Sequence, residues 1–162
     1  MKIKQIVDED FVNYRLPSMY IIMPECDFKC DRECGRTVCQ NSRVAKMDTI
    51  EMDTVKIIER YDANPITHAI VFSGLEPFDT PESLWNFLMV FRYNHADTIV
   101  IYTGYTKEEV EEKFPWVFLY ENVVIKYGRF IPDQESHYDP ILGVNLASPN
   151  QYAEVYNECG SW

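Results

Sequence analysis

The chain has 162 residues, 46% of them hydrophobic and 14% aromatic, and is therefore long enough to bury the core of one ordinary domain. Its 26 acidic residues against 15 basic ones give a formal net charge of -11, which argues against a protein that follows the phosphate backbone of a nucleic acid. No segment approaches the roughly 20 apolar residues of a membrane span, and no signal-like apolar run begins the chain, so we expect a cytoplasmic protein that binds neither membranes nor nucleic acids.

Short runs rich in β-branched and aromatic residues predict four strands, at residues 18–23, 68–73, 97–103 and 122–127, and a weaker fifth at 141–146. Helical spacing of apolar residues predicts helices at about 53–61, 82–92 and 107–114. The run Asp79-Thr80-Pro81-Glu82 has the capping side chains, early proline and acidic first turn of a helix start. This alternation predicts one α/β domain over residues 1–162, with a mostly parallel sheet.

Four of the five cysteines lie in CDFKCDRECGRTVC, residues 26–39, inside a segment without clear periodicity from about residue 24 to 46. In a reducing compartment, clustered cysteines are more often metal ligands or redox groups than disulfides. The run contains no C-x-x-C pair of the kind typical of structural zinc sites, although four thiolates from one loop could still enclose zinc. Three thiolates on an iron–sulfur cluster would instead leave one iron open to a substrate or cofactor.

Three loops follow the carboxyl ends of successive predicted strands: the cysteine loop, residues 73–77 (SGLEP) and residues 103–106 (TGYT). Ligands bind at this edge in parallel α/β folds, so we expect the three loops to converge. Gly74 would let a ligand approach the backbone closely, and Glu76 could accept hydrogen bonds from an ammonium group. Taken alone, the sequence Gly-x-Glu-Pro is also typical of an ordinary turn before a helix that has no binding role.

Further short motifs occur along the chain, in a fixed order with these loops. They are residues 10–14 (DFVNY), 74–77 (GLEP), 102–106 (YTGYT), 127–130 (YGRF) and 148–151 (SPNQ). Together with the cysteine loop they resemble the motifs of radical S-adenosylmethionine (radical SAM) proteins, and in particular of the small activating proteins of anaerobic ribonucleoside-triphosphate reductase. The resemblance covers most of the chain and implies a single radical SAM domain folded as an incomplete β/α barrel.

The sequence departs from this family in two places. The usual C-x3-C-x2-C spacing is replaced by C-x3-C-x8-C if Cys26, Cys30 and Cys39 are the ligands. Cys39 is preferred because Gln40 and Asn41 follow it, as a similar pair follows the family's third cysteine. Cys34 then lies within an insertion as a free thiol, unless it replaces Cys39 as the third ligand. The second departure is Leu75, which stands where the family usually has a second glycine.

The resemblance implies that three thiolates hold a [4Fe-4S] cluster whose open iron binds the amino and carboxylate groups of S-adenosylmethionine. One electron, from a donor such as flavodoxin or ferredoxin, would then cleave the sulfonium bond to methionine and a 5′-deoxyadenosyl radical. In the family this radical removes hydrogen from a glycine of anaerobic ribonucleoside-triphosphate reductase, the expected protein partner. The alternatives are radical modification of another protein or peptide, and a non-enzymatic zinc or iron–sulfur module.

The same resemblance suggests cofactor contacts for five residues, and each has a plainer interpretation. Gly74 and Glu76 would bind the methionine end of the cofactor. Thr103 could face the ribose or be a β-former at a strand end. Lys126 interrupts an apolar strand, so it either faces the cofactor or extends to the surface over apolar neighbours. Asn150 is either near the cofactor or a turn residue. The fifth cysteine, Cys159, is expected to be a free thiol in a polar tail.

Overall fold

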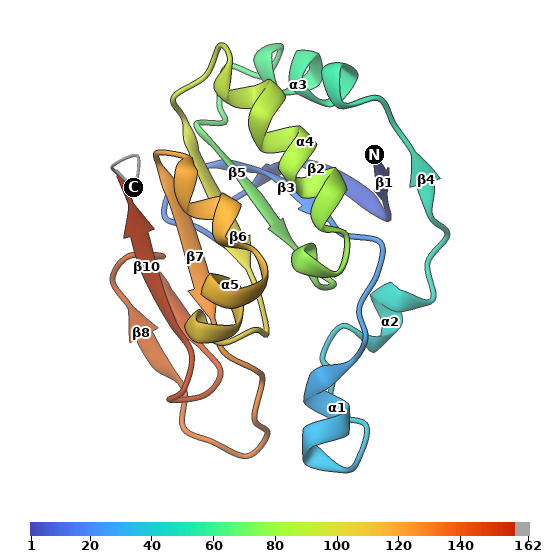
Figure 1. The fold of residues 1–162 in the computed structure, drawn as a ribbon, viewed down its shortest axis with the longest axis vertical. Helices are drawn as coiled ribbons and strands as arrows, with labels where there is room; N and C mark the ends of the chain where they lie inside the picture. Colours follow the sequence, from blue (N-terminus) through green and yellow to red (C-terminus); the bar gives the residue numbers. More distant parts are fainter. Residues whose placement is uncertain (158–162) are drawn as a thin grey trace.

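The computed structural model describes residues 1–157 and is built around a six-stranded sheet of order β10-β7-β6-β5-β3-β2 (Figure 1). Four neighbouring strands inside it are parallel: β3 (Ser18–Ile22), β5 (Ala69–Ser73), β6 (Thr98–Tyr102) and β7 (Val123–Tyr127). These are the four strands that the sequence predicted. Their near-continuous apolar sequences follow from burial on both faces of the sheet.

Both edges of the sheet are antiparallel, which the sequence did not predict. At one edge, β2 (Gln5–Asp10) pairs with β3, and at the other β10 (Tyr152–Tyr156) pairs with β7. Both strands are only partly buried and include acidic residues, three in β2 and one in β10, so neither has the continuous apolar signal of the inner strands. The sheet is therefore mixed, with a parallel centre.

The three predicted helices connect the parallel strands and lie together on one face of the sheet (Figure 1). They are α3 (Thr54–Asp62), α4 (Pro81–Arg92) and α5 (Lys107–Lys113). Their apolar sides and one side of each inner strand form the larger core. A smaller core on the opposite face includes Tyr14, Leu142 and Leu146 from loops and a hairpin. The helices thus cover one face of the sheet, and irregular segments cover part of the other.

The start of α4 agrees with the prediction only in part. Pro81 lies in the first turn as expected, and Glu82 supplies the acidic residue there. The two expected capping side chains have other partners. The hydroxyl of Thr80 donates to the carbonyl of Pro77 at 3.4 Å. Asp79 ends a short 3-10 helix, Pro77–Asp79, and bonds to the cysteine loop instead.

The weaker strand expected at residues 141–146 is reduced to β9 (Val144–Leu146), which pairs with β8 (His137–Asp139) in a separate hairpin. A second small sheet joins β1 (Lys2–Ile3) to β4 (Ile50–Glu51). Within residues 1–157 the strands form an open sheet and no closed barrel. Among the helices of this part of the chain, none has both the length and the apolar character needed to cross a membrane.

The cysteine segment is more ordered than the single long loop that the sequence predicted. It contains two short helices, α1 (Lys29–Cys34) and α2 (Ser42–Ala45), which extend away from the three-helix layer (Figure 1). Gly35 follows α1 with a φ of 66°, which is the left-handed conformation that glycine adopts easily at the end of a helix. The expected free thiol Cys159 lies outside the described residues.

Candidate metal centre and cofactor cavity

Three cysteines of the segment line one cavity, and the fourth lines another. Cys26 follows β3, Cys30 lies in α1, and Cys39 lies between α1 and α2. All three are partly buried and line a cavity of about 320 Å³. Cys34, the last residue of α1, lines a neighbouring cavity of about 740 Å³, which Cys30 also borders. The two candidates for the third ligand therefore differ in position: Cys39 shares the first cavity with Cys26, and Cys34 does not.

The loops that were predicted to converge do so around the first cavity. Gly74 and Glu76 line it from the loop after β5, Thr103 lines it from the loop after β6, and Lys126 lines it from β7. Asn150 instead lines the neighbouring cavity, where its side-chain amide donates to the carbonyl of Arg129 at 2.8 Å. Four of the five expected cofactor contacts are thus grouped with three cysteines.

Glu76 is almost fully buried, with 6% of its surface exposed. Its Oε1 accepts hydrogen bonds from the Thr103 hydroxyl at 2.7 Å and the Phe78 amide at 3.1 Å, and its Oε2 accepts one from the Gly104 amide at 2.8 Å. Burial raises the pKa of Glu76 to about 7 against the effect of these bonds, and the negative charge of Asp79 adds to the rise. These three donors are neutral, so they do not neutralise the carboxylate when it is ionised, and a cationic ligand could do so.

Thr103 orients Glu76. Its hydroxyl donates to Glu76 and accepts a hydrogen bond from the amide of Tyr105 at 3.0 Å. The side chain is 2% exposed, so it is held by these bonds and by packing. The hydrogen bond to the carboxylate explains why a threonine stands at the end of this strand. Contact between Thr103 and a ribose stays a prediction.

Lys126 is buried, at 7% exposure, and does not extend to the surface. Its Nζ donates to the carbonyl of Gly128 at 3.0 Å. Burial lowers the pKa of Lys126 to about 8, while the negative charges of Glu76 and Cys30 act in the opposite direction. The cavity therefore holds a buried cation near a buried carboxylate, which suits a ligand that carries both charges.

Gly74 is required by the backbone path of its loop. Its φ is +82°, and a Cβ at this position would lie 2.6 Å from Cγ2 of Ile22. A side chain would therefore be strained and would also collide with β3. Leu75, which replaces the family's second glycine, is 7% exposed and packs in the larger core.

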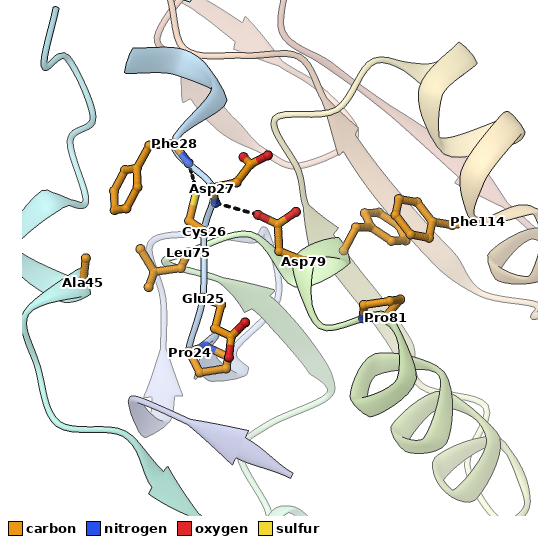
Figure 2. A pocket seen from close by; sticks show the side chains of 11 residues that line it. Pro24, Glu25, Cys26, Asp27, Phe28, Ala45, Leu75, Asp79, Pro81 and Phe114 are labelled. Carbon is orange, nitrogen blue, oxygen red and sulfur yellow. Dashed lines mark hydrogen bonds between the residues drawn. The ribbon is translucent and has the colours of Figure 1, made fainter. Parts of the chain in front are cut away.

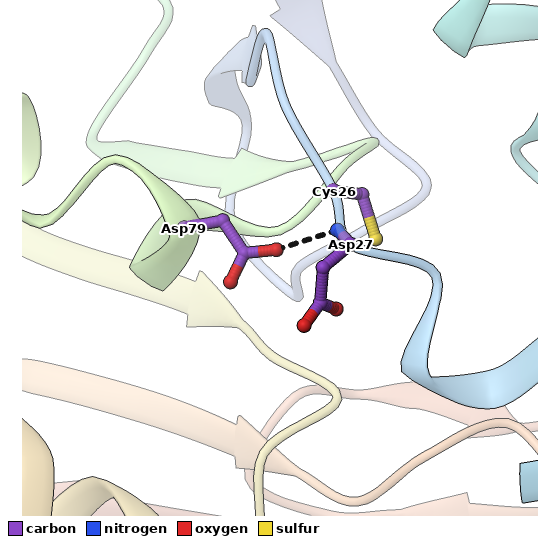
Figure 3. Close-up of side chains that lie close together, drawn as sticks. All are labelled: Cys26, Asp27 and Asp79. Atoms are coloured by element: carbon purple, nitrogen blue, oxygen red, sulfur yellow. Dashed lines mark hydrogen bonds between the residues drawn. The ribbon is translucent and has the colours of Figure 1, made fainter. Parts of the chain in front are cut away.

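The cysteine loop is fixed to the loop after β5. The Glu76 amide donates to the carbonyl of Glu25 at 2.9 Å, and a carboxylate oxygen of Asp79 accepts from the Asp27 amide at 2.7 Å (Figure 3). Lys29 strengthens this junction, because its Nζ lies 2.6 Å from Asp27 and 3.2 Å from Asp79. These contacts explain why Asp79 is turned away from the start of α4.

Cys26, Asp27 and Asp79 bring three possible metal ligands within 4.8 Å of one another (Figure 3). A cation is already present there, because Lys29 pairs with both carboxylates and lies 3.9 Å from the ring centre of Tyr105. Asp79 also accepts a hydrogen bond from the Tyr105 hydroxyl at 2.8 Å. We therefore assign this group to loop attachment.

A third cavity, of about 660 Å³, lies beside the cysteine loop (Figure 2). Cys26 borders it as well as the first cavity. Phe114 and Pro81 contribute from the side of α4 and α5, and Ala45 contributes from α2 (Figure 2). The short helix α2 thus adjoins the cysteine loop.

Several residues around the site were missed by the sequence reasoning. Asn13 and Gln151 line the first cavity, and both belong to motifs already noted, DFVNY and SPNQ. The Gln151 amide donates to the carbonyl of Gly128 at 3.3 Å, the same oxygen that binds Lys126. The final residue of the SPNQ motif was therefore an available signal for the cavity.

Arg129 connects the cysteine helix to the other loops, and no local sequence pattern indicated this connection. Its Nε lies 2.5 Å from Glu33 of α1, and its Nη1 donates to Glu109 at 2.7 Å and to the carbonyl of Gly104 at 3.0 Å. Hydrogen bonding to Arg129 lowers the pKa of Glu109 to about 2. The pairing joins segments far apart in the chain, so local patterns could not reveal it.

A comparison with protein-family models matches residues 17–148 to the family described as a 4Fe-4S single cluster domain. This match covers most of the chain, which therefore belongs to that family and is a 4Fe-4S cluster-binding domain. The searches of curated proteins and of solved structures returned no match. The matched region contains all four cysteines of the segment and the three loops that meet at the cavity.

Proposed function

We propose that the protein is a radical SAM enzyme in which Cys26, Cys30 and Cys39 bind three irons of a [4Fe-4S] cluster. The observation that supports this most strongly is the shared cavity: these three thiols border the same space as Gly74 and Glu76. Cys34 borders a different cavity. Three ligands leave one iron available to the cofactor, and the adjoining carboxylate provides a partner for an amino group.

The thiols themselves fit such a cluster. Burial raises the pKa of Cys26 to about 12 and also raises the pKa of Cys30 and Cys39. A negative charge on Cys39 raises the pKa of both other thiols further, so Cys39 as a thiolate would repel a thiolate at either of them. Metal ligation requires thiolates, and bound iron would neutralise this repulsion.

When bound, the cluster and S-adenosylmethionine would supply reductive cleavage of the sulfonium bond to methionine and a 5′-deoxyadenosyl radical. The protein would bind and orient the cofactor. Glu76, held by Thr103 and Gly104, would accept hydrogen bonds from the methionine amino group. Lys126, buried beside it, would attract the methionine carboxylate. Asn150 would act from outside the cavity through the carbonyl of Arg129.

We further propose that residues 1–162 form a single cytoplasmic radical SAM domain, in which the open sheet is an incomplete β/α barrel. An open sheet leaves a side at which a large protein substrate could cover the site. The proposed substrate is anaerobic ribonucleoside-triphosphate reductase, on which the enzyme would generate a glycyl radical. The ordered motifs support the reductase as substrate, and the family match supports the cluster on which this chemistry depends.

The test combines the reconstituted, reduced protein with S-adenosylmethionine and the reductase under anaerobic conditions. A glycyl-radical EPR signal is expected, and it should be absent when the radical-bearing glycine of the reductase is replaced by alanine. Formation of 5′-deoxyadenosine without that signal would reject the reductase and favour another protein or peptide target. Tight binding of one zinc by four thiolates, without binding of the cofactor, would reject the radical chemistry.

A further inference from the structure

The charge of the cysteine segment differs from that of the rest of the chain. Residues 34–47 contain Arg36, Arg43 and Lys46 and no aspartate or glutamate, although acidic residues outnumber basic ones by 26 to 15 in the whole sequence. All three cations are exposed. A basic segment on an acidic protein creates a local region that attracts negative charge.

Two of these cations are free to bind a partner. Arg36 forms an exposed ion pair with Asp133 at 3.0 Å. Within residues 1–157, neither Arg43 nor Lys46 has a carboxylate oxygen within 4.0 Å. Lys4 lies near the end of the same segment, since its Nζ donates to the carbonyl of Met47, the residue after Lys46, at 2.7 Å. We name Lys4, Arg43 and Lys46 the basic patch.

The basic patch adjoins the proposed cluster ligands. The helix that carries Arg43, α2, begins at Ser42, three residues after Cys39, and the Ser42 amide donates to the carbonyl of Cys39 at 3.3 Å. Ala45 of the same helix borders a cavity that Cys26 also borders (Figure 2). In Figure 1, α2 lies beside α1 and away from the three-helix layer, so the patch is at the periphery of the domain.

We propose that the basic patch docks an acidic one-electron carrier protein that reduces the cluster. This inference rests on the cluster-binding family and on the ligands assigned under the proposed function. One electron would pass from the carrier to the cluster: the carrier is oxidised by one electron, the cluster is reduced by one, and no bond forms or breaks. Because electron transfer slows steeply with distance, the carrier must bind close to the cysteines.

The charge distribution also favours one orientation of the carrier. An acidic protein is repelled by most of a surface whose net charge is -11 and is attracted only where cations gather. Interfaces of electron-transfer partners are small and transient, so a few charges can govern their association. The patch thus combines attraction with proximity to the cluster.

The experiment uses the full chain, reconstituted with iron and sulfide, and recombinant flavodoxin as the acidic probe. The variant carries Arg43→Glu and Lys46→Glu together, and a control for charge reversal away from the patch carries Lys56→Glu on the exposed surface of α3. Binding is measured by titration at low and high salt, and cluster reduction by stopped-flow absorbance with flavodoxin hydroquinone. We expect the double variant to bind about tenfold more weakly at low salt. High salt should remove most of this difference, and the control should behave as wild type.

The outcomes separate this inference from the proposed function. Dithionite, a small reductant that needs no docking surface, should reduce the cluster equally in wild type and variants, which also verifies that the cluster is intact. A second variant with Arg43→Gln and Lys46→Gln should show an intermediate loss of binding. Unchanged flavodoxin binding in the double variant, or no binding by wild type, would overturn the inference. Cofactor cleavage that fails with dithionite, while flavodoxin still binds at the patch, would reject only the proposed function.

Discussion

The hydroxyl of Thr103 donates a 2.7 Å hydrogen bond to Oε1 of Glu76 and so joins the loops that follow β6 and β5. Both side chains are buried, at 2% and 6% exposure, so water is poorly placed to replace either partner. A hydrogen bond to a buried carboxylate is among the stronger ones in proteins. The direction in which Glu76 presents its charge therefore depends on Thr103.

Replacing Thr103 with valine should weaken binding of S-adenosylmethionine. The change keeps the shape of the side chain but removes one donor from Glu76, so we expect the Kd to rise by about tenfold. Calorimetric titration of the cluster-loaded protein measures it. Thr103→Ser keeps the hydroxyl and should remain within about threefold of wild type. Equal affinities for the valine variant and wild type would show that Thr103 does not orient the site.

The affinity for S-adenosylmethionine should depend on pH near 7 through the ionisation of Glu76. Burial raises its pKa to about 7, so the carboxyl group is mostly neutral below that pH and charged above it. Since the amino group of the cofactor requires the charged form, affinity should increase as the pH rises through about 7. Equilibrium dialysis across this range tests the prediction. Glu76→Gln should bind more weakly and without this dependence, and a wild-type profile that is flat here would contradict the assignment.

At higher pH, near 8, the affinity for S-adenosylmethionine should depend on the ionisation of Lys126. Burial lowers its pKa to about 8, so the ammonium group loses its proton as the pH rises through this value. We expect affinity to decline there because the charge that faces the methionine carboxylate is lost. Lys126→Met should remove the decline and lower affinity at neutral pH. If the methionine variant keeps the same decline, another group is responsible for it.

Gly74→Ala should destabilise the apoprotein by about 2–4 kcal/mol, because it combines a strained φ with a collision against Ile22. Gly35→Ala is a matched control, since that residue also has a positive φ but has no atom within 4 Å of an added Cβ. The control should cost about 1 kcal/mol. Urea unfolding of both variants gives the difference, and equal losses would show that close packing does not require Gly74.

Cys39→Ala and Cys34→Ala should have opposite effects on the cluster. Removing Cys39 should reduce cofactor cleavage by at least about a hundredfold. Loss of a direct iron ligand should lower activity more than loss of a residue that only hydrogen-bonds to a ligand. Removing Cys34 should leave iron and sulfide content and activity near wild type, since its side chain borders a separate cavity. Iron analysis and EPR of the reduced proteins measure the effects, and the reverse pattern would assign the third ligand to Cys34.

The inner strands could be predicted because each is a short apolar run buried on both faces, as Ala69–Ser73 illustrates. The edge strands could not, because Gln5–Asp10 is charged and takes its position from pairing with β3. The convergence of the three loops followed from the parallel order alone. The partner of Asp79 did not, since it lies 52 residues away at Asp27.

The burial of Lys126 is a feature of the site that the sequence could not predict either. A strand buried on both faces has no polar side toward which a lysine must point, so the sequence left its orientation open. Arg129 is a similar case, because its contacts with Glu33 and Glu109 join separate elements. Local sequence thus predicts the elements and the edge at which the site forms, whereas long-range pairing determines how its side chains are held.

Radical SAM chemistry on a cluster held by Cys26, Cys30 and Cys39 is tested by quantification of 5′-deoxyadenosine after the reconstituted protein is reduced with dithionite in the presence of S-adenosylmethionine. We expect wild type and Cys34→Ala to produce 5′-deoxyadenosine and methionine in equal amounts, and Cys39→Ala to produce neither. A fully loaded, reduced cluster in wild type that binds no S-adenosylmethionine and forms no 5′-deoxyadenosine would contradict it.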